Sequence, residues 1–170
     1  MKDYFSQQST RLIFRALTEN DIDSWIEFFT GNDRLAFLGI DGSKDDRQLA
    51  TEWILKQLER YETDGFGHLA VIEKSTGVFI GMGGILVRAL EGEKVFEIAY
   101  SLMPAYWNQG FGTEIASQIK KFGKQNQIAD SFISIIHKET SASIHVAHKN
   151  GMRILRETNY LGMEVFIFGD

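Results

Sequence analysis

The sequence predicts an α+β fold, with a largely antiparallel central sheet flanked by about four helices. Three predicted strands follow one another within residues 68–102 and are separated only by short turns, which is typical of antiparallel hairpins. Stretches with the helical spacing of apolar residues lie before and after these strands. The chain therefore lacks the regular strand–helix alternation of a doubly wound parallel sheet.

Each predicted element depends on a periodicity or on a terminating signal. Thr18 is the expected N-cap of the first helix, with Asp21 at its third position. Gly65 and Gly151 end the second and the last helix. Residues 1–10 and 35–42 are expected to lack regular structure. In order, the predicted elements are a strand at residues 11–15, a helix at 18–29, a helix that starts within 43–46 and ends at 64–67, strands at 68–73, 78–88 and 94–102, a helix at 111–126, a strand at 131–136, a helix at 141–150, and strands at 152–157 and 162–168.

Composition indicates an ordinary globular protein with one domain at residues 1–170. The net charge of −5 argues against nucleic-acid binding and weakly favours a cationic or amine substrate. The absence of cysteine excludes thiolate metal sites and a cysteine nucleophile, and the four histidines lack a metal-ligand spacing, so no metal is expected. We expect no membrane segment and a cytoplasmic location, because no apolar run could cross a bilayer and residues 1–8 lack the apolar core of a signal peptide.

The most informative stretch is the loop at residues 107–114, Trp-Asn-Gln-Gly-Phe-Gly-Thr-Glu, which joins a strand to a helix. The first N–H groups of a helix have no partner inside the helix, and they favour negative charge. Gly110 and Gly112 let the backbone come close to a ligand, so the loop predicts an anion site. Ile115 stands where a dinucleotide-binding fold would have its third glycine, and no Gly-Lys-Ser/Thr sequence precedes the helix. Neither a dinucleotide site nor a P-loop is predicted.

This loop and the order of elements resemble the GNAT N-acyltransferase superfamily, and within it the branch of ribosomal-protein N-terminal acetyltransferases (RimJ/RimL type). The likeness covers nearly the whole chain and is most specific over residues 97–114, with further matches at 11–18, 79–85 and 143–152. The resemblance implies a GNAT fold whose sheet is splayed at a cofactor wedge. It also implies direct transfer of an acetyl group from acetyl-CoA to a primary amine, either a protein N-terminus or a small amine or amino acid.

The resemblance further implies where acetyl-CoA would bind. Its diphosphate would lie on the amides of residues 108–113, and its pantetheine arm would pair with the main chain at Leu102 and Met103. Thr140 stands in the place of an asparagine that contacts the pantetheine, and Lys149 would either reach the 3′-phosphate or simply end its helix. The expected cofactor-binding residues are Leu102, Met103, Trp107, Asn108, Gln109, Gly110, Phe111, Gly112, Thr113, Thr140 and Lys149.

Acetyl transfer to an amine needs a base, an oxyanion donor and an acid for the leaving thiolate. Glu97 is the expected base, because partial burial in its apolar stretch would make it a better proton acceptor, and an ion-paired strand residue is the alternative. A backbone N–H near Leu102 is the expected oxyanion donor. By resemblance Ser143 is the expected acid, and a polar first-turn residue is its alternative. Ala147 falls where many family members have an acidic tyrosine, and Tyr160 is a weaker substitute.

Two further questions stay open at the level of sequence. The alternative function is a non-catalytic acyl-CoA-binding or sensing module, which would keep the loop at 107–113 but lack a working acid and base. The first two helices and the last hairpin are expected to shape the acceptor side, and their sequence does not identify the acceptor. The sequence permits a homodimer without specifying one.

Overall fold

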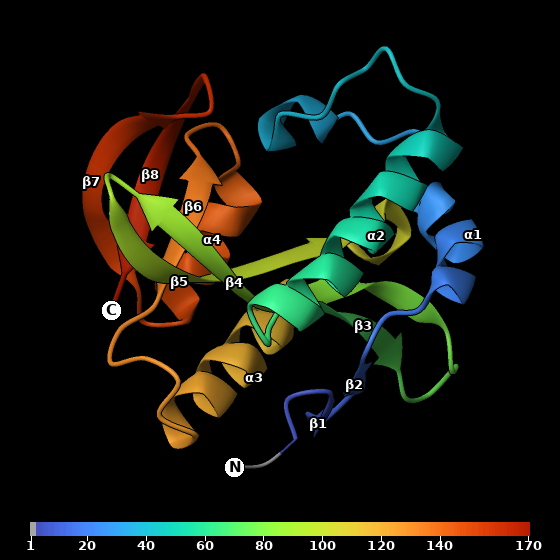
Figure 1. Ribbon diagram of the computed structural model, residues 1–170, viewed down its shortest axis with the longest axis horizontal. Coiled ribbons are helices and arrows are strands. Elements are labelled where there is room, and N and C mark those ends of the chain that lie inside the picture. Colours follow the sequence, from blue (N-terminus) through green and yellow to red (C-terminus); the bar gives the residue numbers. More distant parts are fainter. Residues whose placement is uncertain (1–2) are drawn as a thin grey trace.

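The computed structural model describes residues 3–170 (Figure 1), and only residues 1 and 2 of the predicted domain lie outside it. The strands are β1 (Ser6–Gln8), β2 (Leu12–Arg15), β3 (His68–Glu73), β4 (Phe79–Leu90), β5 (Glu93–Leu102), β6 (Ile133–His137), β7 (Arg153–Tyr160) and β8 (Met163–Gly169). The α-helices are α1 (Ile22–Trp25), α2 (Asp46–Thr63), α3 (Phe111–Gln125) and α4 (Ser141–Lys149). Short 3-10 helices are η1 (Glu19–Asp21), η2 (Ile26–Phe28), η3 (Leu35–Leu38) and η4 (Pro104–Tyr106).

All strands of the described chain join one eight-stranded sheet in the order β1-β2-β3-β4-β5-β6-β8-β7. Neighbouring strands are antiparallel except for β5 and β6. The predicted α+β class and largely antiparallel sheet are therefore confirmed. In the same part of the chain, no helix is both long and apolar enough to cross a membrane.

The N-terminal segment differs from the prediction. Residues 6–8, which were expected to lack regular structure, form the edge strand β1 against β2. The nearby Tyr4 hydroxyl donates to the carbonyl of Gly67 at 2.6 Å and accepts from the N–H of Ile85 at 2.8 Å. These partners are 63 and 81 residues away in the sequence, so local patterning could not predict the segment.

The first predicted helix is also different, because η1, α1 and η2 replace a continuous α-helix over residues 18–29. Thr18 is the N-cap, as predicted, and the carboxylate of Asp21 accepts from the N–H of Thr18 at 2.8 Å. The rings of Trp25 and Phe28 stack with centroids 4.4 Å apart. Residues three apart eclipse one another in a 3-10 helix, so this stacked pair fits the tighter turn.

The two faces of the sheet carry separate hydrophobic cores. Helices α3 and α4 cover one face, over buried residues such as Leu69 and Ile85. Helices α1 and α2 cover the other face, over Ala70 and Met82. The alternation of side chains along β3 and β4 distributes their apolar residues between the two cores.

Glycines in β4 allow close packing at its centre. A Cβ atom at Gly84 would lie 2.1 Å from the carbonyl oxygen of Gly67, and one at Gly83 would lie 2.3 Å from Cγ2 of Ile115 in α3. Both distances are shorter than any non-bonded contact allows. The absence of a side chain at Gly83 therefore lets α3 pack close to the sheet, and its absence at Gly84 lets the backbone at Gly67 approach β4.

Strands β5 and β6 pair at one position only and then diverge. Their parallel pairing consists of the single register position Glu97–Ile133. Beyond it, β5 continues beside β4 as far as Leu102, and β6 continues beside β8 to His137. The sheet is thus splayed between these two strands, as expected for a cofactor wedge.

Candidate active site

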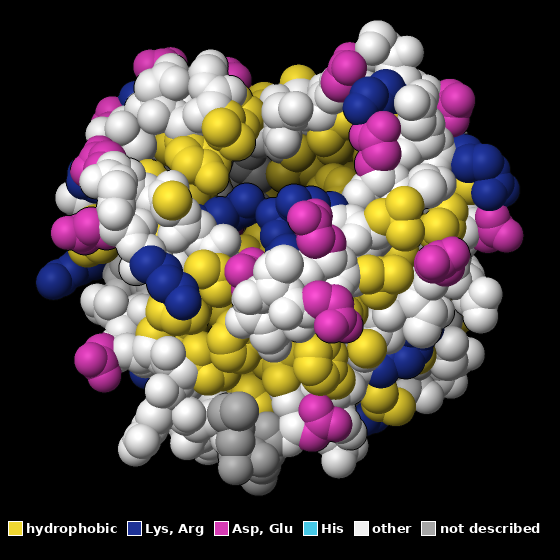
Figure 2. All heavy atoms as spheres, viewed as in Figure 1, with side chains coloured by type: hydrophobic (Ala, Val, Ile, Leu, Met, Phe, Trp, Pro, Cys, Tyr) yellow, Lys and Arg dark blue, Asp and Glu magenta, His cyan; other side chains and the backbone are white. Residues whose placement is uncertain are grey.

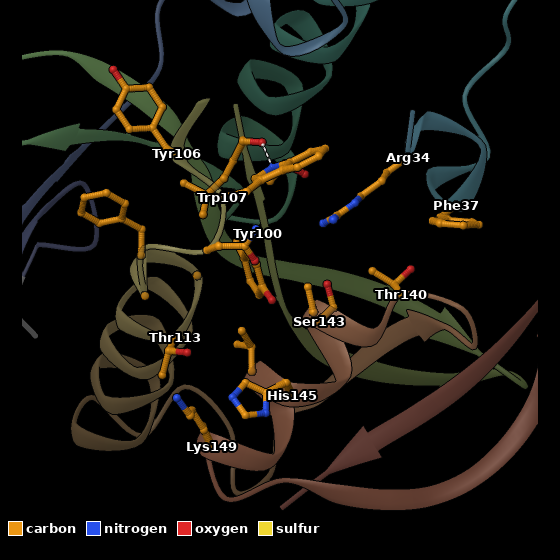
Figure 3. Close-up of a pocket in the computed structure, with 18 of the residues that line it drawn as sticks. Arg34, Phe37, Tyr100, Tyr106, Trp107, Thr113, Thr140, Ser143, His145 and Lys149 are labelled. Carbon is orange, nitrogen blue, oxygen red and sulfur yellow. Dashed lines mark hydrogen bonds between the residues drawn. The ribbon is translucent and has the colours of Figure 1, made fainter. Parts of the chain in front are cut away.

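The splayed ends of β5 and β6 open into two adjoining cavities of about 380 Å³ and about 230 Å³. The first cavity (Figure 3) lies at the N-terminus of α3, and the second lies over β4, β5 and β6. Tyr100, Thr140 and Ser143 line both cavities. A molecule in the first cavity could therefore present a reacting atom to the second at this shared wall.

The N-terminus of α3 opens onto the first cavity with unpaired N–H groups. Gly110 is the N-cap, with φ of +81°, a conformation that glycine adopts readily. The first bond into the helix runs from the N–H of Glu114 to the carbonyl of Gly110 at 3.1 Å. The N–H groups of residues 111–113 consequently have no acceptor within the helix, and these residues line the cavity. An anion placed here would be held by hydrogen bonds and by the helix dipole.

The first turn of α3 contains an acidic residue, Glu114, whose negative charge is balanced by a neighbouring arginine. Glu114 forms an ion pair of 2.7 Å with Arg11 and accepts from the Ser9 hydroxyl at 2.7 Å. Although burial acts in the opposite direction, the hydrogen bonds from Ser9 and Arg11 lower the pKa of Glu114. The carboxylate thus stays ionised and bound on the side of the helix away from the cavity lining.

Basic side chains flank the first cavity. The guanidinium of Arg34 lies 4.0 Å from the centre of the Trp107 ring, and Lys149 extends towards Thr113 (Figure 3). No aspartate or glutamate belongs to the described residues that line this cavity. Although the net charge of the protein is −5, this site is locally positive and suits phosphate groups.

Most of the predicted cofactor-binding residues come together here. Those that line the first cavity are Leu102, Trp107, Asn108, Gly110, Phe111, Gly112, Thr113, Thr140 and Lys149. Gln109 lies outside the lining. Its side-chain amide donates to the carbonyl of Ala105 at 2.9 Å, and its main-chain carbonyl accepts from Arg11 at 3.1 Å. Met103 is buried and also lies outside the lining.

The backbone at the end of β5 presents one free donor. The N–H of Met103 donates to the carbonyl of Ile80 at 3.0 Å, so it is not available to a ligand. Because hydrogen-bonded and non-hydrogen-bonded positions alternate in an antiparallel pair, the N–H of Leu102 faces away from β4, towards the splay. The carbonyl of Leu102 accepts from the Trp107 indole at 2.8 Å (Figure 3). Leu102 therefore keeps its N–H for a ligand, whereas Met103 does not.

Two hydroxyl groups meet at the shared wall. The Ser143 hydroxyl is a hydrogen-bond partner of Tyr100, and burial nevertheless raises the pKa of Tyr100 to about 12. Both groups are protonated at neutral pH. Sequence reasoning identified Ser143 and missed Tyr100. The available signal was the two-residue alternation of β5, which gives Tyr100 and Leu102 the same orientation.

Glu97 lies in the second cavity and is 5% exposed. Its Oε2 accepts from Nε of Arg88 at 2.7 Å, and its Oε1 accepts from the N–H of Ile135 at 3.4 Å. Burial disfavours the charged form of Arg88, but the carboxylate of Glu97 outweighs it and raises the pKa of Arg88. Glu97 is thus an ion-paired residue that also faces a cavity, which leaves the base role untested.

Apolar side chains form the walls of the second cavity. They come from η3, from Trp53 of α2 and from the β7–β8 hairpin, where Leu161 is 78% exposed. Tyr160 lies in this cavity and does not line the first one. Figure 2 shows a hollow between α2 and this hairpin, with apolar walls and basic side chains at its floor. The outer part of the second cavity is therefore shaped by α2, η3 and the last hairpin, whereas no described residue of the first predicted helix lines it.

His68 is a buried imidazole at the edge of the second cavity. Nδ1 accepts from the Trp53 indole at 3.4 Å, and Nε2 is buried without a partner in the described structure. Burial, reinforced by the charges of Arg60 and Arg88, lowers the pKa of His68 to about 3. The folded protein thus keeps this side chain neutral where an unfolded histidine would take up a proton.

This shift predicts a loss of stability on mild acidification. The unfolded histidine binds a proton below its usual pKa of about 6.5. The folded one does so only near 3, so the free energy of unfolding should fall as the pH drops from 6.5 towards 3. Between pH 7.5 and 5.0 the expected loss is about 2 kcal/mol. Urea titrations at several pH values measure it.

The variant His68→Gln should flatten this pH dependence, and the exposed His148→Gln should leave it unchanged. The window above pH 5 separates His68 from the carboxylates, which titrate at lower pH. Equal slopes for the wild type and His68→Gln would contradict the assignment.

Comparison with known proteins agrees with this geometry. The family described as acetyltransferase (GNAT) domain matches residues 11–153. The uncharacterised protein YkkB of Bacillus subtilis (strain 168) is 31% identical over 111 residues, which cover 65% of this chain and 64% of that protein, slightly less than two thirds of its length. The described residues contain no group of three or more possible metal ligands.

Solved structures share the fold at low sequence identity. A putative ribosomal-protein-serine acetyltransferase from Vibrio cholerae is 18% identical, with a TM-score of 0.80 over 100% of this chain and 99% of that chain. RimL, a ribosomal L7/L12 alpha-N-protein acetyltransferase solved with coenzyme A, is 14% identical, with a TM-score of 0.76 over 95% and 94% of the two chains. The family match covers most of the chain, from β2 to the start of β7, and includes the splayed strands β5 and β6. On that evidence the protein belongs to the GNAT family of N-acetyltransferases.

Proposed function

We propose that this protein transfers the acetyl group of acetyl-CoA directly to a primary amine, either a protein N-terminus or a small amine or amino acid. The observation that carries the proposal is the junction of the two cavities at Tyr100 and Ser143. One cavity has an anion-binding helix end, and the other has a carboxylate and room for an acceptor. The name of RimL supports a protein N-terminus as one class of acceptor.

The residues of the first cavity fit acetyl-CoA. The N–H groups of residues 111–113 would hold the diphosphate, with Arg34 and Lys149 as balancing charges. The N–H of Leu102 would donate to the pantetheine arm or to the acetyl oxygen at the splay. When bound, acetyl-CoA supplies the activated acetyl group.

The residues at the junction would move the protons. Glu97 would accept the proton of the amine, directly or through a water, and its ion pair with Arg88 would hold the carboxylate in place. Ser143 would donate a proton to the departing sulfur, and the hydroxyl of Tyr100 would hold Ser143 in place. No covalent intermediate with the protein is needed.

Removing the acid should slow the chemical step. Ser143→Ala is expected to lower kcat about tenfold, a modest effect because a thiolate leaves readily even without protonation. CoA affinity should be unchanged. Tyr100→Phe should act in the same direction, and the double variant should lose less than the product of the two effects, because the two hydroxyls act together. Steady-state kinetics measure these values.

Ser117→Ala is the matched control for the acid, because it removes an exposed hydroxyl from α3 outside both cavities. An unchanged kcat in Ser143→Ala would remove Ser143 from the acid role.

The proposed function is tested by following thiol release from acetyl-CoA with a panel of amines and N-terminal peptides, alongside calorimetric titration with CoA. Binding of CoA together with acetylation of at least one amine is expected. The ion pair of Glu97 favours one rival, a non-catalytic acyl-CoA-binding module whose base is occupied by Arg88. CoA binding without turnover of any acceptor would favour that rival, and no CoA binding would refute both.

A further inference from the structure

The charged residues that line the second cavity are Arg88 and Glu97. Arg88 uses only its Nε to bind Glu97, and its two Nη groups have no hydrogen-bond or ion-pair partner in the described structure. Arg60 of α2 lies outside the lining, is half-buried and forms no ion pair within residues 3–170. It lies close enough to Arg88 and Glu97 for both charges to act on it. A second guanidinium group therefore lies near this ion pair without a carboxylate of its own.

A third group adds another donor. The Trp53 indole can only donate, so Nδ1 of His68 accepts and the proton of the neutral ring lies on Nε2. That N–H is buried, has no partner in the described structure, and belongs to a residue that lines the second cavity. A buried donor without an acceptor is unfavourable, so it indicates a group that arrives with the substrate.

We propose that the amine acceptor carries an anionic group, a carboxylate in the first instance, which binds to the free end of Arg88 in the second cavity while its nitrogen faces Glu97, with the nearby charge of Arg60 favouring the anion. This inference rests on the proposed function and names its substrate class. The His68 N–H and the free Nη groups of Arg88 offer donors to the same anion. Figure 2 shows the basic floor beneath the apolar walls.

The short distance between Arg88 and Glu97 limits the class of acceptor further. Nε of Arg88 and Oε2 of Glu97 are 2.7 Å apart, so an anion bound to the free end of Arg88 and an amine at Glu97 would be neighbours. A carboxylate one or two carbons from the nitrogen meets this condition. It occurs in a free α-amino acid and at a peptide N-terminus whose first residue is acidic, and the apolar walls would contact the remaining side chain. A simple cationic amine, which the net charge of −5 favours, would meet a basic floor.

Pairs of matched acceptors test whether a carboxylate is required and whether it belongs to a free amino acid or to an acidic N-terminal residue. Leucine is compared with leucinamide, and a peptide that begins with aspartate is compared with the same peptide that begins with asparagine. The anionic member of a pair should have a kcat/KM about tenfold to a hundredfold higher, because a charge-assisted pair with arginine is lost in the other. A preference only in the first pair identifies free amino acids, and one only in the second identifies acidic N-termini.

Variants of Arg60 connect the preference to the positive charge beside this cavity. Arg60→Met should raise KM for the anionic acceptor and reduce the preference, with kcat little changed, and Arg60→Lys should keep more of it. Arg47→Met is the control, because it removes a positive charge from the same helix at a side chain that is 64% exposed and pairs with Asp23. It should leave the preference intact.

Equal rates for both members of each pair, or a full preference in Arg60→Met, would overturn the inference alone. Acetylation of no amine at all would refute the proposed function and this inference with it.

Discussion

Replacing Glu97 by glutamine is expected to lower kcat by about 10²–10⁴-fold, the usual contribution of a positioned general base. Glutamine keeps the size of the side chain and one oxygen that can accept from Arg88, although its NH2 group then faces the N–H of Ile135, and it cannot take up the proton of the amine. CoA affinity should be unchanged, because Glu97 lies in the second cavity and outside the first. Steady-state assays and calorimetric titration with CoA measure these two quantities.

Two controls separate chemistry from folding. Glu93→Gln removes an exposed carboxylate from the same strand and should have wild-type kinetics. Thermal unfolding of Glu97→Gln is needed because the change leaves Arg88 without its ion-pair partner in a largely buried place. A folded Glu97→Gln protein with unchanged kcat would restrict Glu97 to its ion pair.

Replacing Gly112 by valine is expected to weaken CoA binding about 100-fold. A Cβ at this position would lie 3.1 Å from Cε2 of Tyr100 and 3.5 Å from Cγ2 of Val146, so the two methyl groups must enter the cavity at the helix end. There they would displace a diphosphate from the N–H groups of residues 111–113. Two lost charge-assisted hydrogen bonds correspond to an effect of about this size.

The effect should be graded, with Gly112→Ala intermediate between glycine and valine. Lys121→Val places the same branched side chain on an exposed position of α3 and controls for helix propensity. Calorimetric dissociation constants provide the comparison. A Gly112→Val protein that unfolds at the wild-type temperature and binds CoA normally would show that the diphosphate lies elsewhere.

Much of the fold could be predicted because its signals are local. The turn between β4 and β5, the apolar face of α3 and the glycine that ends α4 each involve residues near one another in the sequence. The replacement of the first helix by 3-10 turns could not be predicted, because stacked rings alter a spacing that looks α-helical. Strand β1 was not predicted for another reason: the neighbouring Tyr4 forms its hydrogen bonds with residues more than 60 positions away in the sequence.

In the candidate site, too, residues that are close in sequence could be predicted and residues brought together by the fold could not. The anion loop at residues 107–114 is continuous in sequence, so its glycines and helix start could be recognised together. Arg34 was missed because its position over the Trp107 ring depends on how η3 folds back across the wedge. The group formed by Arg60, His68 and Arg88 comes from α2, β3 and β4, and nothing in the spacing of these residues predicts their approach.

The wall shared by the two cavities has a thermodynamic consequence. Tyr100, Thr140 and Ser143 face both spaces, so a ligand that fixes these side chains in one cavity changes the surface that the other offers. Linkage makes any such effect reciprocal: whatever factor acetyl-CoA imposes on the affinity for the amine, the amine imposes on the affinity for acetyl-CoA. A dissociation constant measured for either substrate alone therefore describes a different surface from the one on which acetyl transfer takes place.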